Sequence, residues 1–343
     1  MVNQGKNAAN PFGLASILTQ DERKSACRKH GSDNSFHPKE IGVTILLNKN
    51  SLDIKTATKL LPKREPFSHK GSFGRALLIC GSKNMVGCCA LATEGALRSG
   101  AGLVTLAFPD CLYTSLTSRL TENLFLPLST NEDGTISSDS ITTILNSCIN
   151  SDVVMVGCGL GTSKSIKDLI KVLVTQNEKP LIIDADALNC LSEFIDALSD
   201  KKCEILLTPH PGEMSRLCGL NISDIEENRE EIIIDFCKTY KVNVLLKGHE
   251  TLICNSNADK LYINKTGNTG LSKGGAGDLL SGIIAGLTPS MCGNLFNSAV
   301  LGAFVHGMSA DLLKNEMSEY SILPSDCGKI LGKVYALIED EKD

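Results

Sequence analysis

The stretch DVVMVGCGLGTSKSIKDLIKVL, residues 152–173, decides the fold class. It opens with Asp152–Val156, a short and continuous apolar run that is typical of a strand buried on both faces of a parallel sheet. A glycine-rich turn follows at once, and Ile166, Leu169 and Ile170 then recur at helical spacing. This order of strand, turn and helix predicts an α/β sandwich with right-handed crossovers.

The same unit recurs along the chain. Further buried strands are expected at Ala76–Cys80, Leu103–Phe108, Leu181–Ile183, Ile205–Leu207 and Val242–Leu246. Two short runs, Thr251–Cys254 and Lys260–Ile263, predict an antiparallel hairpin at a sheet edge, so the sheet is expected to be mixed. The C-terminal third is expected to be mostly helical, at 278–287, 295–314 and 328–338.

Residues 1–53 differ in texture from the rest of the chain. They carry scattered charges and many Asn and Ser residues, and only Ile41–Leu47 has the pattern of a short strand. We therefore expect an N-terminal extension over 1–53, to which no chemistry is assigned, and one α/β domain over 54–343.

Composition excludes several classes of protein. Of the 343 residues, 42% are hydrophobic and 21% are charged, which is enough apolar material for a packed core. A net charge of −5, 4% aromatic residues and no Trp argue against a nucleic-acid-binding surface. No apolar run reaches about 18 residues, and no apolar segment of a secretory signal is visible. Fourteen cysteines without a Cys-x-x-Cys pair indicate reduced thiols in a cytoplasmic protein.

Polar or glycine-rich tracts follow five of the expected strands directly. They are Gly81-Ser82, Gly157–Gly161, Asp184–Asp186, Thr208–Glu213 and Lys247–Thr251. In a parallel α/β sheet, ligands bind beyond the carboxyl ends of the strands. The five tracts therefore predict one ligand site at that edge of the sheet.

A sixth tract, Asn264–Asp278, runs into an apolar helix and contains the sharpest single motif. Within it Gly274, Gly275, Ala276 and Gly277 would permit close backbone approach, and the helix N-terminus offers unpaired N–H groups. This pattern predicts an anion cradle, with phosphate as the favoured ligand, and puts the Asp278 carboxylate beside it as a candidate general base. The alternative is that Asp278 only caps the helix and that the glycines only form a tight turn.

Two familiar nucleotide motifs are missing. The chain has no Gly-x-x-x-x-Gly-Lys-[Ser/Thr] sequence, so a P-loop enzyme is excluded. The segment Gly157–Thr162 lacks the last glycine of Gly-x-Gly-x-x-Gly, which disfavours a Rossmann hydride-transfer enzyme. A phosphate site without either motif indicates another kind of α/β fold.

Several single residues allow two interpretations. His210, between two prolines, either points into the crevice or is a hydrogen-bonding surface group. Asp184 and Asp186 either hold Mg²⁺ or cap the next helix. Lys247 either neutralises phosphate or ends a strand in solvent, and His306 has the apolar neighbours of a core residue.

Seven ordered tracts, over about residues 57–340, resemble the ADP-dependent bacterial (S)-NAD(P)H-hydrate dehydratases of the ribokinase-like superfamily. These tracts are His69–Gly74, Ala96–Val104, Val156–Gly161, Ile183–Leu188, Thr208–Glu213, Lys247–Thr251 and Gly267–Asp278. The resemblance implies a ribokinase-like three-layer α/β/α sandwich around a mostly parallel sheet.

The resemblance also implies an activity, that of a carbon–oxygen lyase in metabolite repair. In this family the C6 hydroxyl of the S form of hydrated NADH or NADPH is phosphorylated, phosphate leaves, and the dihydronicotinamide is restored. Mg²⁺ is the implied cofactor, with no ligand residues assigned. The tract Thr208–Glu213 resembles the ADP-using branch, so ADP is the expected phosphoryl donor and AMP the expected product.

Site residues carried over from the family fall into two groups, with Asp278 as the implied catalytic base. The implied nucleotide contacts are Lys247, Gly248, His249, Glu250, Thr251 and Gly277, and the implied substrate contacts are Cys89, Gly159, His210 and Asp278. Cys89 marks a departure, because this chain has Gly87-Cys88-Cys89 where family members usually have Gly-Ala-Ala.

The resemblance further implies a homo-oligomer, with a tetramer expected. The 53 residues ahead of the matched region are too few for the epimerase domain of many bacterial relatives, so a separate epimerase partner is expected. Two alternatives stay open: a thiazole or hydroxymethylpyrimidine kinase of the same superfamily, and a catalytically silent nucleotide-binding regulator.

Overall fold

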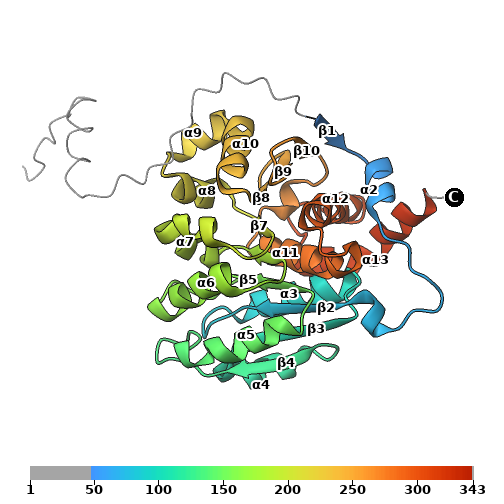
Figure 1. Cartoon of the computed structure of the whole chain (residues 1–343). Coiled ribbons are helices and arrows are strands. Elements are labelled where there is room, and N and C mark those ends of the chain that lie inside the picture. Colours follow the sequence, from blue (N-terminus) through green and yellow to red (C-terminus); the bar gives the residue numbers. More distant parts are fainter. Residues whose placement is uncertain (1–47, 342–343) are drawn as a thin grey trace, which may run out of the picture. The chain divides into compact units, whose positions relative to one another are not determined.

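The computed structural model describes residues 48–341, in which ten strands form one sheet (Figure 1). The strand order is β1-β10-β9-β8-β7-β6-β5-β2-β3-β4. The strands are β1 (Asn48–Leu52), β2 (Arg75–Ile79), β3 (Leu103–Pro109), β4 (Leu124–Leu128), β5 (Val153–Val156), β6 (Leu181–Ile183), β7 (Ile205–Leu207), β8 (Asn243–Leu246), β9 (Thr251–Cys254) and β10 (Lys260–Asn264). Strand β9 runs antiparallel to both of its neighbours, and the remaining pairs in this part of the chain are parallel.

Every strand expected between residues 76 and 263 is confirmed, each within one residue at both ends. Two edge strands were not expected. Strand β1 is polar and mostly exposed, and β4 contains Pro127, so neither has the continuous apolar run of a central strand. Because β1 pairs with β10, the sheet begins ahead of the domain boundary expected at residue 54. The strand expected at Ile41–Leu47 lies outside the described residues.

Helices cover both faces of the sheet. They are α2 (Ile54–Leu60), α3 (Val86–Arg98), α4 (Tyr113–Thr117), α5 (Ile141–Ile149), α6 (Lys164–Gln176), α7 (Asp186–Leu191), α8 (Pro211–Cys218), α9 (Ile222–Glu227), α10 (Arg229–Tyr240), α11 (Ala276–Leu287), α12 (Leu295–Lys314) and α13 (Pro324–Asp340). Figure 1 shows α3, α11, α12 and α13 on one side of the strands and α6 to α10 on the other. The three-layer sandwich and the three C-terminal helices are therefore confirmed.

Helix α11 is held against α3 by unusually close backbone contact. A Cβ atom on Gly282 would lie 2.1 Å from the Ala92 carbonyl oxygen, and one on Gly286 would lie 2.3 Å from that of Ala96. A larger residue at either position would force the helices apart. This contact fixes α11 with its N-terminus at the site described below.

The described residues show two further features that bear on the expectations above. Their cysteines are free, and most of them are buried. None of the helices in residues 48–341 is both long enough and apolar enough to span a membrane.

Candidate active site

Five polar tracts lie at one edge of the sheet, as the sequence predicts. They follow β2, β5, β6, β7 and β8, which are adjacent and parallel, so all five lie at the carboxyl ends of the strands. Backbone hydrogen bonds join neighbouring tracts. The Gly81 amide donates to the Cys158 carbonyl at 2.8 Å, and the Lys247 amide donates to the Pro209 carbonyl at 2.8 Å.

A buried ion pair lies at the centre of this edge. Lys247 Nζ is 2.7 Å from Asp184 Oδ1, and the two side chains are 19% and 1% exposed. The other carboxylate oxygen of Asp184 accepts a hydrogen bond from the Ser281 hydroxyl at 2.7 Å. Lys247 and Asp184 are thus each other's main partner. None of the interpretations offered from sequence for either residue included this ion pair.

The pair is ionised in the folded protein. Burial opposes ionisation of Asp184, but the charge of Lys247 and the hydrogen bonds from Lys247 and Ser281 hold the pKa of Asp184 below its usual range. Burial likewise opposes the charge on Lys247, but Asp184 and Glu213 raise the pKa of Lys247 above its usual value. Glu213 Oε2 lies 3.7 Å from Lys247 Nζ. The site therefore holds a fixed ammonium group.

The N-terminus of α11 lies beside this ammonium group. A Cβ atom on Gly277 would be 3.4 Å from Lys247 Nζ and 3.8 Å from Asp184 Oδ2. The helix is capped by Gly275 at φ +96°, a conformation that favours glycine, and no side chain caps its first N–H groups. A Cβ atom on Gly274 would meet no atom within 4 Å. This geometry supports an anion cradle, because uncapped amides and a buried ammonium group meet there.

Asp278 is the third residue of α11, three positions beyond the N-cap residue, so the structure excludes the alternative in which Asp278 caps the helix. Burial raises the pKa of the Asp278 carboxyl above its usual range, a hydrogen bond with the Cys158 thiol opposes this rise, and the nearby Asp184 carboxylate adds to it. A carboxylate with a raised pKa is a better proton acceptor, which suits a general base.

His210 caps α8 and is tied to the ion pair through Glu213. Its Nδ1 accepts the amides of Gly212 and Glu213 at 3.0 and 3.3 Å, and its own amide donates to Glu213 Oε2 at 2.8 Å. Since Nδ1 accepts, the ring proton is assigned to Nε2, on a side chain that is 52% exposed. The structure thus supports the hydrogen-bonding interpretation, and His210 Nε2 lies 3.4 Å from Glu213 Oε1.

The tract Lys247–Thr251 turns sharply after β8. Gly248 has φ +146° and Glu250 has φ +53°, while the Thr251 hydroxyl donates to the Gly248 carbonyl at 3.0 Å. The His249 and Glu250 carbonyls both accept from the Arg229 guanidinium. Sequence reasoning missed Arg229 and Ser281, because neither belongs to a recognisable motif and each contacts a residue that is distant in sequence.

Cys88 packs against the Gly157–Gly161 tract, and Cys89 packs against Gly81. A Cβ atom on Gly159, which has φ +65°, would be 2.6 Å from Cys88 Sγ, and one on Gly81 would be 2.5 Å from Cys89 Sγ. Cys89 is fully buried, so its thiol has no surface to offer a ligand in this structure. A substrate contact at Cys89 stays a prediction that this burial disfavours, whereas Gly159 lies in the tract itself.

Comparisons with known proteins agree with this geometry. A protein family described as NAD(P)H-hydrate dehydratase matches residues 76–333. The chain is 35% identical over 309 residues to the bifunctional NAD(P)H-hydrate repair enzyme of Moorella thermoacetica, covering 89% of this chain and 57% of that protein. It is 31% identical over 280 residues to the ADP-dependent (S)-NAD(P)H-hydrate dehydratase of Bacillus subtilis, covering 81% and 95% respectively.

A solved structure resembles the fold over most of its length. It is the ADP/ATP-dependent NAD(P)H-hydrate dehydratase of Bacillus subtilis, co-crystallised with ATP and Mg²⁺, with a TM-score of 0.70 and 27% identity over 84% of this chain and 98% of that chain. The chain spans little more than half of the Moorella bifunctional relative but nearly all of the Bacillus dehydratase. The ribokinase-like fold is therefore confirmed, and the chain belongs to the NAD(P)H-hydrate dehydratase family.

Proposed function

We propose that the chain catalyses the ADP-dependent dehydration of the S form of hydrated NADH and NADPH, which restores the reduced dinucleotide and releases AMP and phosphate. The observation that carries this proposal is the position of the α11 N-terminus. Its Gly277 lies against the buried Lys247–Asp184 pair, and Asp278 follows directly in the same helix turn. Such an arrangement provides both a phosphate site and a proton acceptor.

Binding of the nucleotide would use the fixed charges of the site. The phosphates would lie at Gly274–Gly277, where the α11 amides and Lys247 supply positive potential, and the rest of the nucleotide would lie along Gly248–Thr251. Asp184 contributes by holding the Lys247 ammonium at 2.7 Å in a buried position. An ammonium fixed before the reaction stabilises phosphoryl charge without reorganisation.

The chemical step would proceed at Asp278. Its carboxylate takes the proton of the C6 hydroxyl while the terminal phosphoryl group of ADP passes to that oxygen, which releases AMP. Phosphate then leaves with the electron pair of the C–O bond, and loss of a ring proton restores the double bond. Gly159 and the half-exposed ring of His210 would face the hydrated dinucleotide.

Mg²⁺ fits this site as an ion held largely by phosphates. Within residues 48–341 no group of three or more His, Cys, Asp or Glu side chains is arranged to bind a metal ion. Asp184 is already committed to Lys247 and Ser281. One or two carboxylates together with substrate phosphates are the usual Mg²⁺ ligands, and Asp186 and Asp278 lie close enough for their charges to interact. When bound, Mg²⁺ would neutralise charge on the phosphates.

Further parts of the proposal rest on the relatives. The Moorella relative is named as bifunctional, and we propose that a separate epimerase supplies the S hydrate to this chain. ADP is favoured as donor because the similar dehydratases are named ADP-dependent, although the crystallised relative is named ADP/ATP-dependent. A homotetramer in the cytoplasm is the proposed form of the protein.

The test is direct. The purified full chain is incubated with hydrated NADH, MgCl₂ and either ADP or ATP, and the absorbance of the reduced nicotinamide is followed. A rise with ADP, with AMP as product, is expected. A rise with ATP alone would support the proposed reaction and show that ATP, rather than ADP, is the phosphoryl donor. The alternative kinase would be established by two results together. The absorbance would not rise with either nucleotide, and a thiazole or hydroxymethylpyrimidine alcohol would instead be converted to a stable phosphorylated product.

A further inference from the structure

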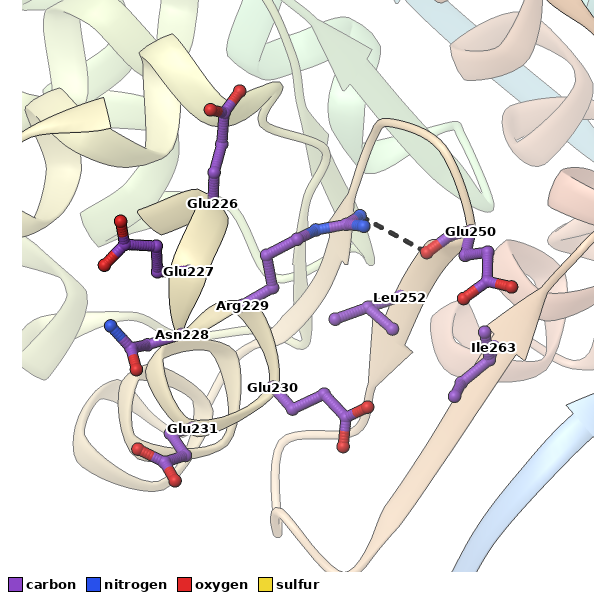
Figure 2. A pocket seen from close by; sticks show the side chains of 9 residues that line it. All are labelled: Glu226, Glu227, Asn228, Arg229, Glu230, Glu231, Glu250, Leu252 and Ile263. Atoms are coloured by element: carbon purple, nitrogen blue, oxygen red, sulfur yellow. Dashed lines mark hydrogen bonds between the residues drawn. The ribbon is translucent and has the colours of Figure 1, made fainter. Parts of the chain in front are cut away.

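A cavity of about 380 Å³ lies beside the nucleotide tract, between the start of α10 and strands β9 and β10 (Figure 2). Five glutamates contribute to its lining, together with Leu252 and Ile263. Arg229 supplies the one positive charge among the lining residues, and Figure 2 shows its guanidinium group pointing toward Glu250. The position of this arginine is not explained by the proposed chemistry.

Arg229 bridges two successive carbonyl groups of the nucleotide tract. Its Nη1 donates to the His249 carbonyl at 2.5 Å, and its Nη2 donates to the Glu250 carbonyl at 3.2 Å. A Cβ atom on Gly248 would lie 3.3 Å from Nη2, so the guanidinium also packs against the preceding residue. A planar fork of donors is suited to such a bridge, whereas a single ammonium group is not.

The segment held by Arg229 has a backbone that needs support. Glu250 adopts φ +53°, which is unfavourable for a residue with a side chain, and Gly248 adopts φ +146°. Strained conformations persist where surrounding contacts determine them, and they concentrate at ligand sites. The two hydrogen bonds from Arg229 fall on the residue with the strained φ and on its neighbour.

Helix stability does not account for an arginine at this position. Arg229 is the first residue of α10, where the positive end of the helix dipole disfavours a cation. Burial lowers the pKa of Arg229, and the charges of Glu250, Glu226 and Glu230 oppose this effect. Its Nε atom is buried without a hydrogen-bond partner. These costs are offset by the contacts with the nucleotide tract.

We propose that Arg229 is a positioning residue that sets the backbone shape of Gly248–Thr251 and thereby the affinity of the site for an adenine nucleotide. The inference rests on the proposed function, since it concerns the tract assigned there to the nucleotide. Arg229 acts through His249 and Glu250, and it takes no part in the phosphoryl transfer at Asp278.

The test compares Arg229→Gln and Arg229→Lys with Glu227→Gln, a matched change at an exposed residue that lines the same cavity. Loss of one net charge-assisted hydrogen bond predicts about a ten-fold rise in both the KM and the calorimetric Kd for ADP in Arg229→Gln. The kcat and the KM for hydrated NADH should stay within about two-fold of the parent values. The KM and Kd for ADP of Arg229→Lys should lie between those of the parent and those of Arg229→Gln. All these constants should be unchanged in Glu227→Gln.

Two results would overturn the inference. One is an unchanged KM and Kd for ADP in both Arg229 variants. The other is a kcat that falls with the fraction of folded protein while the KM for ADP stays constant, which would indicate a structural role only. If the parent chain neither binds ADP nor restores NADH, the proposed function fails as well, so the two failures are distinguishable.

Discussion

Replacing Lys247 by Met removes one partner of a buried ion pair and retains the aliphatic part of the side chain. Asp184 is 1% exposed, and it would keep only uncharged side-chain donors, such as the Ser281 hydroxyl at 2.7 Å and the Cys158 thiol at 3.8 Å. Removal of one partner from such a pair leaves an uncompensated buried charge and typically costs about 3–5 kcal/mol. We therefore expect Lys247→Met to lower the free energy of unfolding at pH 7 by about that amount.

The loss should depend on pH with a definite sign. In the parent the folded-state pKa of Asp184 lies below the unfolded value near 3.8, so this carboxylate contributes stability above that pH and loses it as the pH falls further. In Lys247→Met the hydroxyl hydrogen bonds still lower the pKa of Asp184, but burial is the largest influence and is expected to raise the folded-state pKa above the unfolded value. Protonation of Asp184 then removes the unpaired buried charge from the variant. The difference in free energy of unfolding between the variant and the parent should therefore shrink as the pH falls from 7 toward 4.

Urea unfolding followed by far-ultraviolet circular dichroism at pH 7 and pH 4.5 measures both effects. Lys329→Met is the matched control, because its exposed Nζ lies 3.1 Å from Asp326 and should contribute far less. The double variant Lys247→Met/Asp184→Asn should recover part of the loss, since the Asp184 charge is no longer buried without its partner. A deficit below about 1 kcal/mol at pH 7, or one that does not change with pH, would refute the reasoning.

Three further outcomes follow from the same geometry. Asp278→Asn should abolish turnover while the Kd for ADP stays within about three-fold, and an active variant would remove Asp278 from the mechanism. Gly277→Val should weaken ADP binding measured by calorimetry, since even its Cβ would lie 3.4 Å from Lys247 Nζ, and unchanged affinity would contradict the cradle. Because the pKa of Asp278 is raised and the base must be ionised, kcat/KM should fall on the acid side at a pH above the ordinary aspartate value of 3.8, and a flat acid limb would argue against this base.

Sequence periodicity predicted the sheet well where burial dictates the residue type. Val153–Val156 and Leu181–Ile183 are fully buried, so their apolar runs are as clear in sequence as in the structure. Strand β1, with the sequence Asn-Lys-Asn-Ser-Leu, buries only Leu52 and pairs with β10 through its backbone. Backbone pairing at an edge does not depend on apolar side chains, so this strand has no sequence signal of its own.

The sequence predicted which tracts form the site, but it did not predict the contacts between their side chains. The glycines of the cradle and the strand-end positions follow from local backbone requirements, which a sequence carries. The partnership of Asp184 with Lys247 spans 63 residues and depends on how three strands line up. Tertiary placement also decided that Gly275 rather than Asp278 is the N-cap of α11, and that the Cys89 thiol lies inside the core.

Two carboxylates near Lys247, those of Asp184 and Asp278, have opposite environments, and this difference supports the roles proposed for them. Asp184 is in direct contact with the ammonium group, which holds its pKa below the usual range, whereas burial and the Asp184 charge raise the pKa of Asp278. Groups whose pKa values are pushed apart in this way divide the work of a site. In the proposed mechanism Asp184 stays ionised and fixes Lys247 for the phosphates, and Asp278, with its higher pKa, is the proton acceptor. Exchanging the two roles would require the ammonium group to contact Asp278, and Lys247 Nζ is 2.7 Å from Asp184 instead.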